Sequence, residues 1–386
     1  MADMIERYLQ ELIRQSTPDR TAWNVEKIRE GAEIRWNYID GCMLTALIAM
    51  TDITGDDRYA AFAERVGDYF VQEDGSIRTF RPEKRELDDY NESRILIPLA
   101  RRTGKDKYRK AAEQQYRYLT EQPRTWEGSF WHKKIYPDQV WLDGTYMALP
   151  FMAMYQREMG DGDYSDIIGQ LRIVRKRMRD PETGLYYHGY DASRKAFWAD
   201  PETGLSRNFW LRADGWFACA LADMAEIVPA DRPERTEIAG MLAELMDSVR
   251  KYMDPETGMY MQVIDQGRRE GNYPETSGSA MMAYAMLKGA RLGILDNWYR
   301  ISGRKTFTGI TDGFMTVRNG MPELTNICLV AGLGPEDNRR RDGSYEYYIS
   351  EPIVSNDAKG AAPYALAYTE IRRISDQRTA VGDPDT

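Results

Sequence analysis

The sequence contains few of the residues on which metal and thiol chemistry depend. It has only two histidines, His132 and His188, and neither lies at zinc-ligand spacing from another soft ligand. The three cysteines, Cys42, Cys219 and Cys328, lie far apart in apolar contexts, which is typical of buried thiols rather than of a disulfide or metal site. These shortages argue against zinc catalysis and a Ser-His-Asp triad. We expect no metal, no cofactor and no effect of a chelator, and any enzyme activity should rely on carboxylates for proton transfer.

Long apolar runs and an excess of positive charge are also missing. No segment approaches the length needed to cross a bilayer. A net charge of -9 without a long basic run argues against nucleic acid as a partner. The N-terminal segment MADMIERYLQELIRQ has one apolar helical stripe with charges between, so it is not a signal peptide. We therefore expect a cytoplasmic protein that is monomeric or weakly homo-oligomeric, without a nucleic-acid or membrane partner.

Helical periodicity dominates the chain, and the helical segments are of two alternating kinds. The amphipathic segments are 5–13, 59–70, 108–119, 164–178 and 238–252. The segments that are apolar nearly all round are 42–50, 95–100, 144–154, 215–225, 277–290 and 359–371. A helix without a polar face should be covered on all sides. The pattern thus predicts an all-α fold in which an inner barrel of helices is wrapped by an outer ring.

A weak internal repeat agrees with this arrangement. TGDDRYAAFAERVGDYF begins at Thr54 and TGKDKYRKAAEQQYRYL begins at Thr103, 49 residues later, and a looser copy begins at Met159. An open helical solenoid would show the same repeat, although all-apolar helices favour closure. We expect one domain over residues 1–375, a loop or short hairpin at 185–199, an irregular stretch at 300–356 and a disordered tail at 376–386.

Several of the apolar helices begin with an aspartate next to glycine. In an alternating ring all inner helices run the same way, so their N-termini and partial positive charge gather at one end, which suits an anionic ligand. For Asp40 and Asp214 we favour helix N-caps, although Asp40 is retained as a candidate substrate-binding residue. Asp143 differs because it lies in the apolar run VWLDGTYMALPF, where an ionised carboxylate is costly to bury. Asp88 either caps the helix containing Ile95 or shares a pocket with Asp143.

Aromatic residues are frequent near these helix starts, and flat amphipathic rings suit sugar faces, although large aromatics are more often core. The segment NFWLRADGW places Arg212 between Trp210 and Trp216. An arginine in this setting is a candidate for gripping a carboxylate. His132 and His188 are either hydrogen-bonded loop histidines or donors that orient substrate hydroxyls or a ring carboxylate.

With these residues assembled, the sequence resembles the unsaturated rhamnogalacturonyl hydrolases of glycoside hydrolase family 105 and, more distantly, the unsaturated glucuronyl hydrolases of family 88. The matching segments are RWNYIDGCMLTAL, ELDDYNESRIL, WHKKIYPDQVWLDGTYMALPF, FWLRADGW, PETSGSAMMAY and YEYYISEPIVSNDAKGAAPYALAYTE. The resemblance implies an (α/α)6 barrel. It also implies that Asp143 and Asp88 are the catalytic carboxylates and that the pocket is lined by His132, Trp141, His188, Trp210, Arg212 and Trp216. The order Leu-Asp-x-Tyr-Asn favours Asp88 over Asp89.

The same resemblance implies an unusual reaction on a small acidic disaccharide with an unsaturated uronic acid at its non-reducing end. Asp143 would protonate C4 of the enol ether and activate water for attack at C5, after which the hemiketal opens and releases the sugar. An acid that protonates carbon must first be neutral. Apolar walls and an ionised Asp88 favour this state, whereas a position near a helix N-terminus opposes it.

Three other functions are compatible with parts of the pattern. An inverting glycosidase on the same barrel would hold Asp88 and Asp143 roughly 6.5–9.5 Å apart on either side of a saturated bond. A sugar epimerase typically needs a pair of catalytic histidines, and we discount it because both histidines lie in the first half of the chain. A non-catalytic sugar-binding barrel would keep its function in an Asp143→Asn variant.

Overall fold

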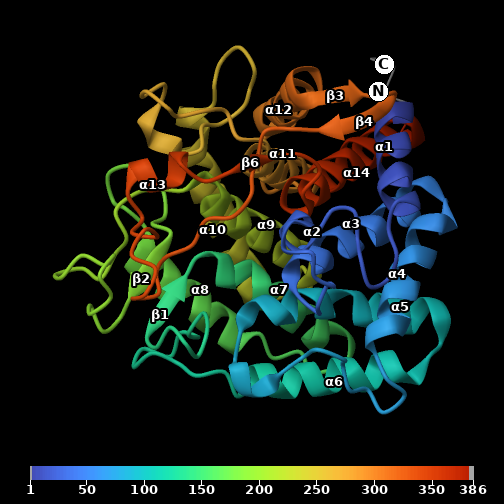
Figure 1. The fold of residues 1–386 in the computed structure, drawn as a ribbon, viewed down its shortest axis with the longest axis horizontal. Coiled ribbons are helices and arrows are strands. Elements are labelled where there is room, and N and C mark those ends of the chain that lie inside the picture. The colour runs from blue at the N-terminus through green and yellow to red at the C-terminus, as the bar shows by residue number, and fades with distance from the viewer. Residues whose placement is uncertain (1, 382–386) are drawn as a thin grey trace.

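The computed structural model describes residues 2–381, which form an inner and an outer layer of helices (Figure 1). The inner elements are α3 (Tyr38–Thr54), a 3₁₀ segment (Leu87–Ile95) that continues into α5 (Leu96–Thr103), α7 (Asp143–Glu158), α9 (Leu211–Ile227), α11 (Thr276–Arg291) and α14 (Ala358–Val381). Each packs against the next along the chain, and α14 packs against both α11 and α3. The ring therefore closes, and the predicted (α/α)6 barrel is confirmed.

The outer helices are α1 (Ala2–Arg14), α4 (Asp57–Phe70), α6 (Asp106–Thr120), α8 (Ser165–Met178), α10 (Pro233–Val249) and α12 (Asn297–Phe314). Five of them pack against the inner element that precedes them in the chain, whereas α1 lies beside α4 and α14, where the Tyr368 hydroxyl donates to Glu6 at 3.0 Å. The prediction that 300–356 is irregular is wrong at its start, because α12 occupies residues up to Phe314.

Short elements fill the connections. Three antiparallel two-stranded sheets pair β1 (Gln139–Trp141) with β2 (Gly189–Asp191), β3 (Met315–Arg318) with β4 (Met321–Leu324), and β5 (Ile327–Cys328) with β6 (Ile353–Val354). The remaining short helices are α2 (Val25–Glu30), α13 (Tyr345–Ile349) and 3₁₀ turns at Pro82–Lys84, Arg250–Tyr252 and Ile264–Gln266.

The last helix is longer than the sequence suggested. α14 continues to Val381, past Asp376, where the tail was expected to begin, and residues 382–386 lie outside the described part of the chain. Within residues 2–381, no helix combines the length and apolar character needed to traverse a bilayer.

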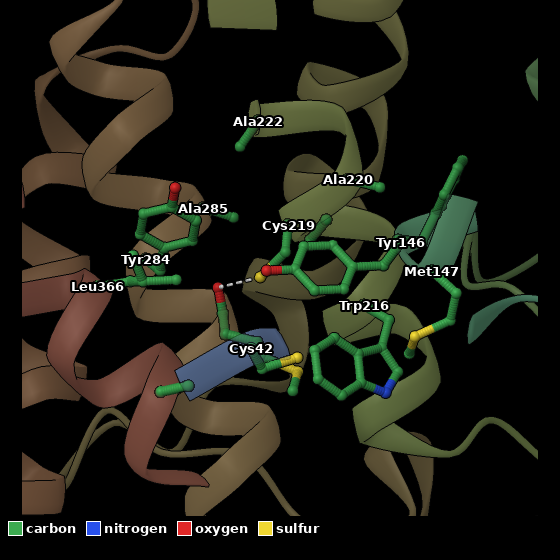
Figure 2. Packing of buried hydrophobic residues seen from close by; sticks show 14 of the residues in the cluster. Cys42, Tyr146, Met147, Trp216, Cys219, Ala220, Ala222, Tyr284, Ala285 and Leu366 are labelled. Carbon is green, nitrogen blue, oxygen red and sulfur yellow. Dashed lines mark hydrogen bonds between the residues drawn. The ribbon is translucent and has the colours of Figure 1, made fainter. Parts of the chain in front are cut away.

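The inner helices meet in an apolar core rich in small side chains. Figure 2 shows Cys42 of α3, Tyr146 of α7, Cys219 of α9, Tyr284 of α11 and Leu366 of α14 gathered at the centre of the ring. All three cysteines are buried and free, as predicted. Burial raises the pKa of Cys42 to about 12, so this thiol stays protonated and behaves as a small hydrophobe.

One ionic cluster interrupts this core. Asp223 accepts hydrogen bonds from the Arg94 guanidinium at 2.5 Å and from the Lys288 ammonium at 2.8 Å, and all three side chains are buried. Burial alone would raise the pKa of Asp223, but Lys288 and Arg94 lower it to about 2. Arg94 also lies 4.8 Å above the Tyr146 ring, which stacks on Trp216 with ring centres 4.8 Å apart. The cluster thereby supports an aromatic side chain near the inner-helix N-termini.

The packing of α3 on the segment Leu87–Ile95 yields a stability prediction. A methyl group on Gly41 would lie 2.5 Å from the backbone Cα of Glu92, whereas one on Gly240, exposed in α10, would meet nothing within 4 Å. We expect Gly41→Ala to destabilise the fold by about 2–3 kcal/mol because two backbones must separate. Gly240→Ala, the matched control, should stabilise it by up to about 1 kcal/mol. Denaturant unfolding of both variants checks this, and equal stabilities would contradict the described packing.

Candidate active site

Two short strands fix the position of Asp143. β1 and β2 pair so that Trp141 lies opposite Gly189, and the Leu142 amide donates to the His188 carbonyl at 2.9 Å. Asp143 follows as the first residue of α7, beside His188. Figure 1 shows the β1–β2 ribbon at one edge of the molecule. Residues 185–199 contain no helix, as expected, and their strand β2 pairs with β1 rather than forming a separate hairpin.

Asp143 and His188 face each other, but their facing atoms form no hydrogen bond. Asp143 Oδ2 lies 3.2 Å from His188 Nε2, yet both atoms are buried and neither makes a hydrogen bond with any other described residue. His188 Nδ1 lies 2.8 Å from the Tyr348 hydroxyl, which fixes the imidazole plane. The N-cap of α7 is Leu142, so helix capping does not account for Asp143. Buried polar atoms normally have partners, and this pair therefore indicates a place for a bound polar group.

Asp88 lies on the other side of His132. Its carboxylate pairs with the Lys133 ammonium at 2.6 Å and lies 3.5 Å from His132 Nε2. A methyl group on Gly144, the residue after Asp143, would sit 3.2 Å from His132 Nδ1, so the His132 ring lies between Asp88 and the first turn of α7. The neighbouring Asp89 turns elsewhere and accepts a hydrogen bond from the Asn37 amide at 3.1 Å. Asp88, rather than Asp89, therefore contacts His132 and Lys133.

His132 is neutral in this setting. Burial, reinforced by the positive charge of Lys133, lowers the pKa of His132 to about 3. Its 3.5 Å contact with Asp88 is therefore not an ion pair at neutral pH. The His132 ring stacks on Trp141 at 4.5 Å with an interplanar angle of 16°, which holds it in place.

The low pKa of His132 predicts a pH dependence of stability. An unfolded histidine binds a proton near pH 6.5, whereas folded His132 does so only near pH 3, so the stabilisation from its neutral form is complete above pH 6.5 and declines as pH falls. We expect the free energy of unfolding of the wild type, minus that of His132→Gln, to fall by about 2–3 kcal/mol between pH 6.5 and 4.5. Denaturant titrations at both pH values measure this difference, and a pH-independent difference would contradict the assignment.

Aromatic rings form the walls around these polar groups. Trp141 lies between His132 and Tyr136, whose ring stacks on it at 5.1 Å. Trp210 lies 4.8 Å from the His188 ring, and its indole NH donates to Gln262 at 3.3 Å. Trp141, Trp210 and Trp216 are all buried among protein side chains.

Arg212 lies next to Trp210, and each of its three guanidinium nitrogens donates to the protein. Its Nε donates to the Ser277 hydroxyl at 2.8 Å, and its terminal nitrogens donate to the carbonyls of Cys328 and Leu329. Glu275 lies 3.7 Å away, and the guanidinium lies 5.2 Å from the centre of the neighbouring Trp210 ring. Arg212 therefore contributes positive charge next to Trp210, which adjoins His188.

The two aspartates interpreted as N-caps have other roles, so that interpretation is wrong. The N-cap of α3 is Asn37, and that of α9 is Trp210. Asp40 is enclosed by donors from Thr21, Trp23 and Asn24 at 2.6–2.8 Å, and burial raises its pKa to about 6. Asp214 accepts from the Tyr186 amide at 3.1 Å, and its burial raises its pKa well above the usual range. Each aspartate ties an inner helix to a neighbouring segment.

A cavity of about 630 Å³ borders the aromatic wall. Tyr136 lines it on one side, and the stack of Tyr136 on Trp141 connects it to the site. The rest of its lining comes from the outer end of the β1–β2 ribbon, residues 195–198 and residues 334–337. In the part of the chain that the structure describes, no three His, Cys, Asp or Glu side chains are grouped so as to hold a metal ion.

Sequence reasoning missed two residues of this site. Lys133 directly follows His132 and lies 2.6 Å from Asp88. In the sequence, only its position within the matching segment WHKKIYPDQVWLDG indicated a role. Tyr348 comes from α13, 160 residues after its partner His188, and only its occurrence in another matching segment, YEYYISEPIVSNDAKG, pointed to it.

Comparisons with known proteins identify the family of this chain. A sequence model of Glycosyl Hydrolase Family 88 matches residues 11–375. A solved glycoside hydrolase of family 105 from C. acetobutylicum is 39% identical, with a TM-score of 0.86 over 95% of this chain and 99% of its own.

Two curated proteins match smaller parts of the chain. The 24.9 kDa protein in the picA locus of Rhizobium radiobacter is 39% identical over 237 residues, which are 58% of this chain and 97% of that protein. The unsaturated rhamnogalacturonyl hydrolase YesR of Bacillus subtilis is 31% identical over 204 residues, which are 51% of this chain and 56% of that protein. The chain therefore belongs to Glycosyl Hydrolase Family 88 and to the related family 105, and it is a glycoside hydrolase that resembles the unsaturated rhamnogalacturonyl hydrolases.

Proposed function

We propose that this glycoside hydrolase is an unsaturated uronyl hydrolase. Its substrates are short oligosaccharides left by a polysaccharide lyase, which carry a 4,5-unsaturated uronic acid at the non-reducing end. Family membership supports this class. The similarity to YesR and to a family 105 enzyme favours unsaturated galacturonyl-rhamnose as the preferred disaccharide.

In this proposal Asp143 is the general acid and then the general base. Its carboxylic acid gives a proton to C4 of the enol ether, and positive charge develops at C5, stabilised by the ring oxygen. The resulting carboxylate removes a proton from water as the water oxygen bonds to C5. The hemiketal then opens to a C5 ketone, which leaves a hemiacetal at C1 that expels the neighbouring sugar. One water is consumed, and the acid form of Asp143 is restored.

His188 and Asp88 support this proton transfer. His188, fixed by Tyr348, lies 3.2 Å from Asp143 and orients the carboxyl group or a bound water. Asp88 is held by Lys133 at 2.6 Å and accepts a hydrogen bond from a substrate hydroxyl.

The remaining candidate residues bind or position the sugar. The rings of Trp141, Trp210 and Trp216 enclose it, while neutral His132 orients a hydroxyl. Arg212 attracts the substrate carboxylate through its charge, while each of its three nitrogens already donates to a protein acceptor. Asp40 acts indirectly by fixing residues 21–24 against α3.

The observation that carries this proposal is the buried, unpartnered pair of Asp143 Oδ2 and His188 Nε2 within an aromatic enclosure. The near-ultraviolet absorbance of unsaturated uronates provides the test. We expect it to decay when the protein is mixed with lyase-generated disaccharides from a panel of rhamnogalacturonan, ulvan, heparin and gellan, fastest with the rhamnogalacturonan product. Release of sugar from a saturated analogue, without loss of absorbance from any panel member, would contradict the proposal.

A further inference from the structure

One cation near the site, Arg341, has a side chain that makes no hydrogen bond or ion pair with the residues that the structure describes. Arg341 lies half-buried in the loop that joins β5 to α13, and its backbone is fixed by bonds from its amide to Asn338 and from the Gly334 amide to its carbonyl, at 3.1 and 2.8 Å. Among residues 2–381, no group forms a hydrogen bond or ion pair with its guanidinium.

The preceding arginines in the loop are different. Arg339 pairs with Glu336 at 2.6 Å, and Arg340 pairs with Glu351 at 2.5 Å. Deeper cations of the site are paired too, as Lys133 is with Asp88. A guanidinium presents five donors in a planar fork, so leaving one half-buried and unpaired indicates that its partner is supplied from outside the protein.

Arg341 points toward the aromatic wall of the site. A methyl group on Gly332 would lie 3.3 Å from Arg341 Nη1 and 3.3 Å from Trp141 Cζ3, so the guanidinium and the indole approach each other across this glycine. The same indole stacks on His132 at 4.5 Å, and His132 lies 3.5 Å from Asp88.

The charge of Arg341 also acts on α2. Burial would raise the pKa of Glu26 in α2, but Lys359, Arg212 and, less strongly, Arg341 lower it. The guanidinium of Arg341 is therefore close enough to Glu26 to act on it through its charge. Glu26 already pairs with Lys359 at 2.7 Å and forms no ion pair with Arg341. The guanidinium donors of Arg341 therefore remain available to a ligand.

We propose that Arg341 binds an anionic oxygen group of the sugar substrate, a carboxylate or a sulfate, at the mouth of the Asp143 site. This inference rests on the proposed function, since it assumes that the ligand is an acidic sugar. The anion comes either from the unsaturated ring itself or from the sugar that leaves. A planar guanidinium can hold either group through two parallel hydrogen bonds. Arg341 binds and positions the substrate and takes no part in proton transfer.

Arg341→Gln tests this role, because glutamine keeps a polar side chain of similar reach but removes the charge. We expect KM for the preferred unsaturated disaccharide to rise roughly tenfold to a hundredfold, as is usual for losing a hydrogen bond to a charged group, with kcat changed by less than about threefold. Arg339→Gln is the matched control, since it removes the same charge from an exposed pair on the same loop, and both constants should remain unchanged. Thermal melting verifies that both variants fold.

Substrate pairs identify which anion is bound. If Arg341 holds the carboxylate of the unsaturated ring, the methyl ester should bind the wild type as weakly as the free acid binds Arg341→Gln, and the variant should not distinguish them. If Arg341 holds an anion on the leaving sugar, only the wild type should prefer a sulfated leaving sugar over its neutral counterpart. An equal loss with every charged and neutral substrate, or no loss at all, would overturn the proposal.

Calorimetric binding of the same disaccharides separates this inference from the proposed function. A wild type that binds the acidic sugars through Arg341 but hydrates none of them would refute the proposed reaction and keep the binding role. A wild type that hydrates them with no contribution from Arg341 would support the proposed reaction and refute the binding role of Arg341.

Discussion

Replacing Asp143 by asparagine should lower kcat for the unsaturated disaccharide by about 10³–10⁴-fold while leaving its binding nearly unchanged. Asparagine has nearly the same shape and can still face His188, which lies 3.2 Å from the native carboxylate. It cannot give a proton to carbon or take one from water. The decay of near-ultraviolet absorbance measures the rate, and calorimetry with the same sugar measures binding.

Asp214→Asn is a matched control for this experiment. Asp214 also precedes a glycine in the first turn of an inner helix, is fully buried and has a raised pKa, so asparagine resembles its protonated form. Because it accepts a hydrogen bond from the Tyr186 amide and does not adjoin His188, activity should remain within a few-fold of the wild type. A similar loss in both variants would mean that Asp143 acts through folding, and full activity of Asp143→Asn would remove it from the reaction.

Replacing Asp223 by leucine should destabilise the protein by about 3–5 kcal/mol. The substitution leaves Arg94 and Lys288 buried with one fewer anion, and Arg94 loses its 2.5 Å contact. A buried charge without its partner costs far more than an intact pair contributes. Denaturant unfolding provides the measurement.

Glu237→Gln provides the comparison for this prediction. Glu237 pairs with Arg172 at 2.7 Å on the outer surface, where such pairs contribute at most about 1 kcal/mol. If Asp223→Leu proved no more harmful than this exposed change, the core network would not be a structural requirement. The Asp223→Leu variant should also show altered Trp216 fluorescence, since Arg94 lies over the Tyr146 ring that stacks on that indole.

The barrel was predictable because its inner helices are apolar on every side. This pattern can be recognised in the sequence without knowledge of tertiary contacts. The missed outer helix shows the limit of that reasoning. α12 reads NWYRISGRKTFTGITDGF, and its buried face consists of Tyr299, Phe307 and Ile310 among glycine, serine and threonine. Its apolar stripe is too sparse to stand out, and the helix is stabilised by packing on α11 and α14.

The surroundings of Asp143 were predictable because local sequence creates them. Asp143 lies within an apolar run, and the structure places it in an aromatic enclosure next to His188. The partners from α13 and its preceding loop were not predictable, because Tyr348 and Arg341 reach the site from far along the chain through irregular backbone. No helical or strand period links such segments to the residues they meet.

In the proposed reaction, a proton from Asp143 becomes a hydrogen atom on C4 of the unsaturated ring. In heavy water, the wild type should add one deuterium to C4 of the unsaturated ring, on a single face, as the double bond disappears, and Asp143→Asn should do so at a strongly reduced rate. Proton magnetic resonance of the product follows both events. A product that keeps its double bond and gains solvent oxygen only at C1 would show ordinary glycoside hydrolysis instead and would contradict the account.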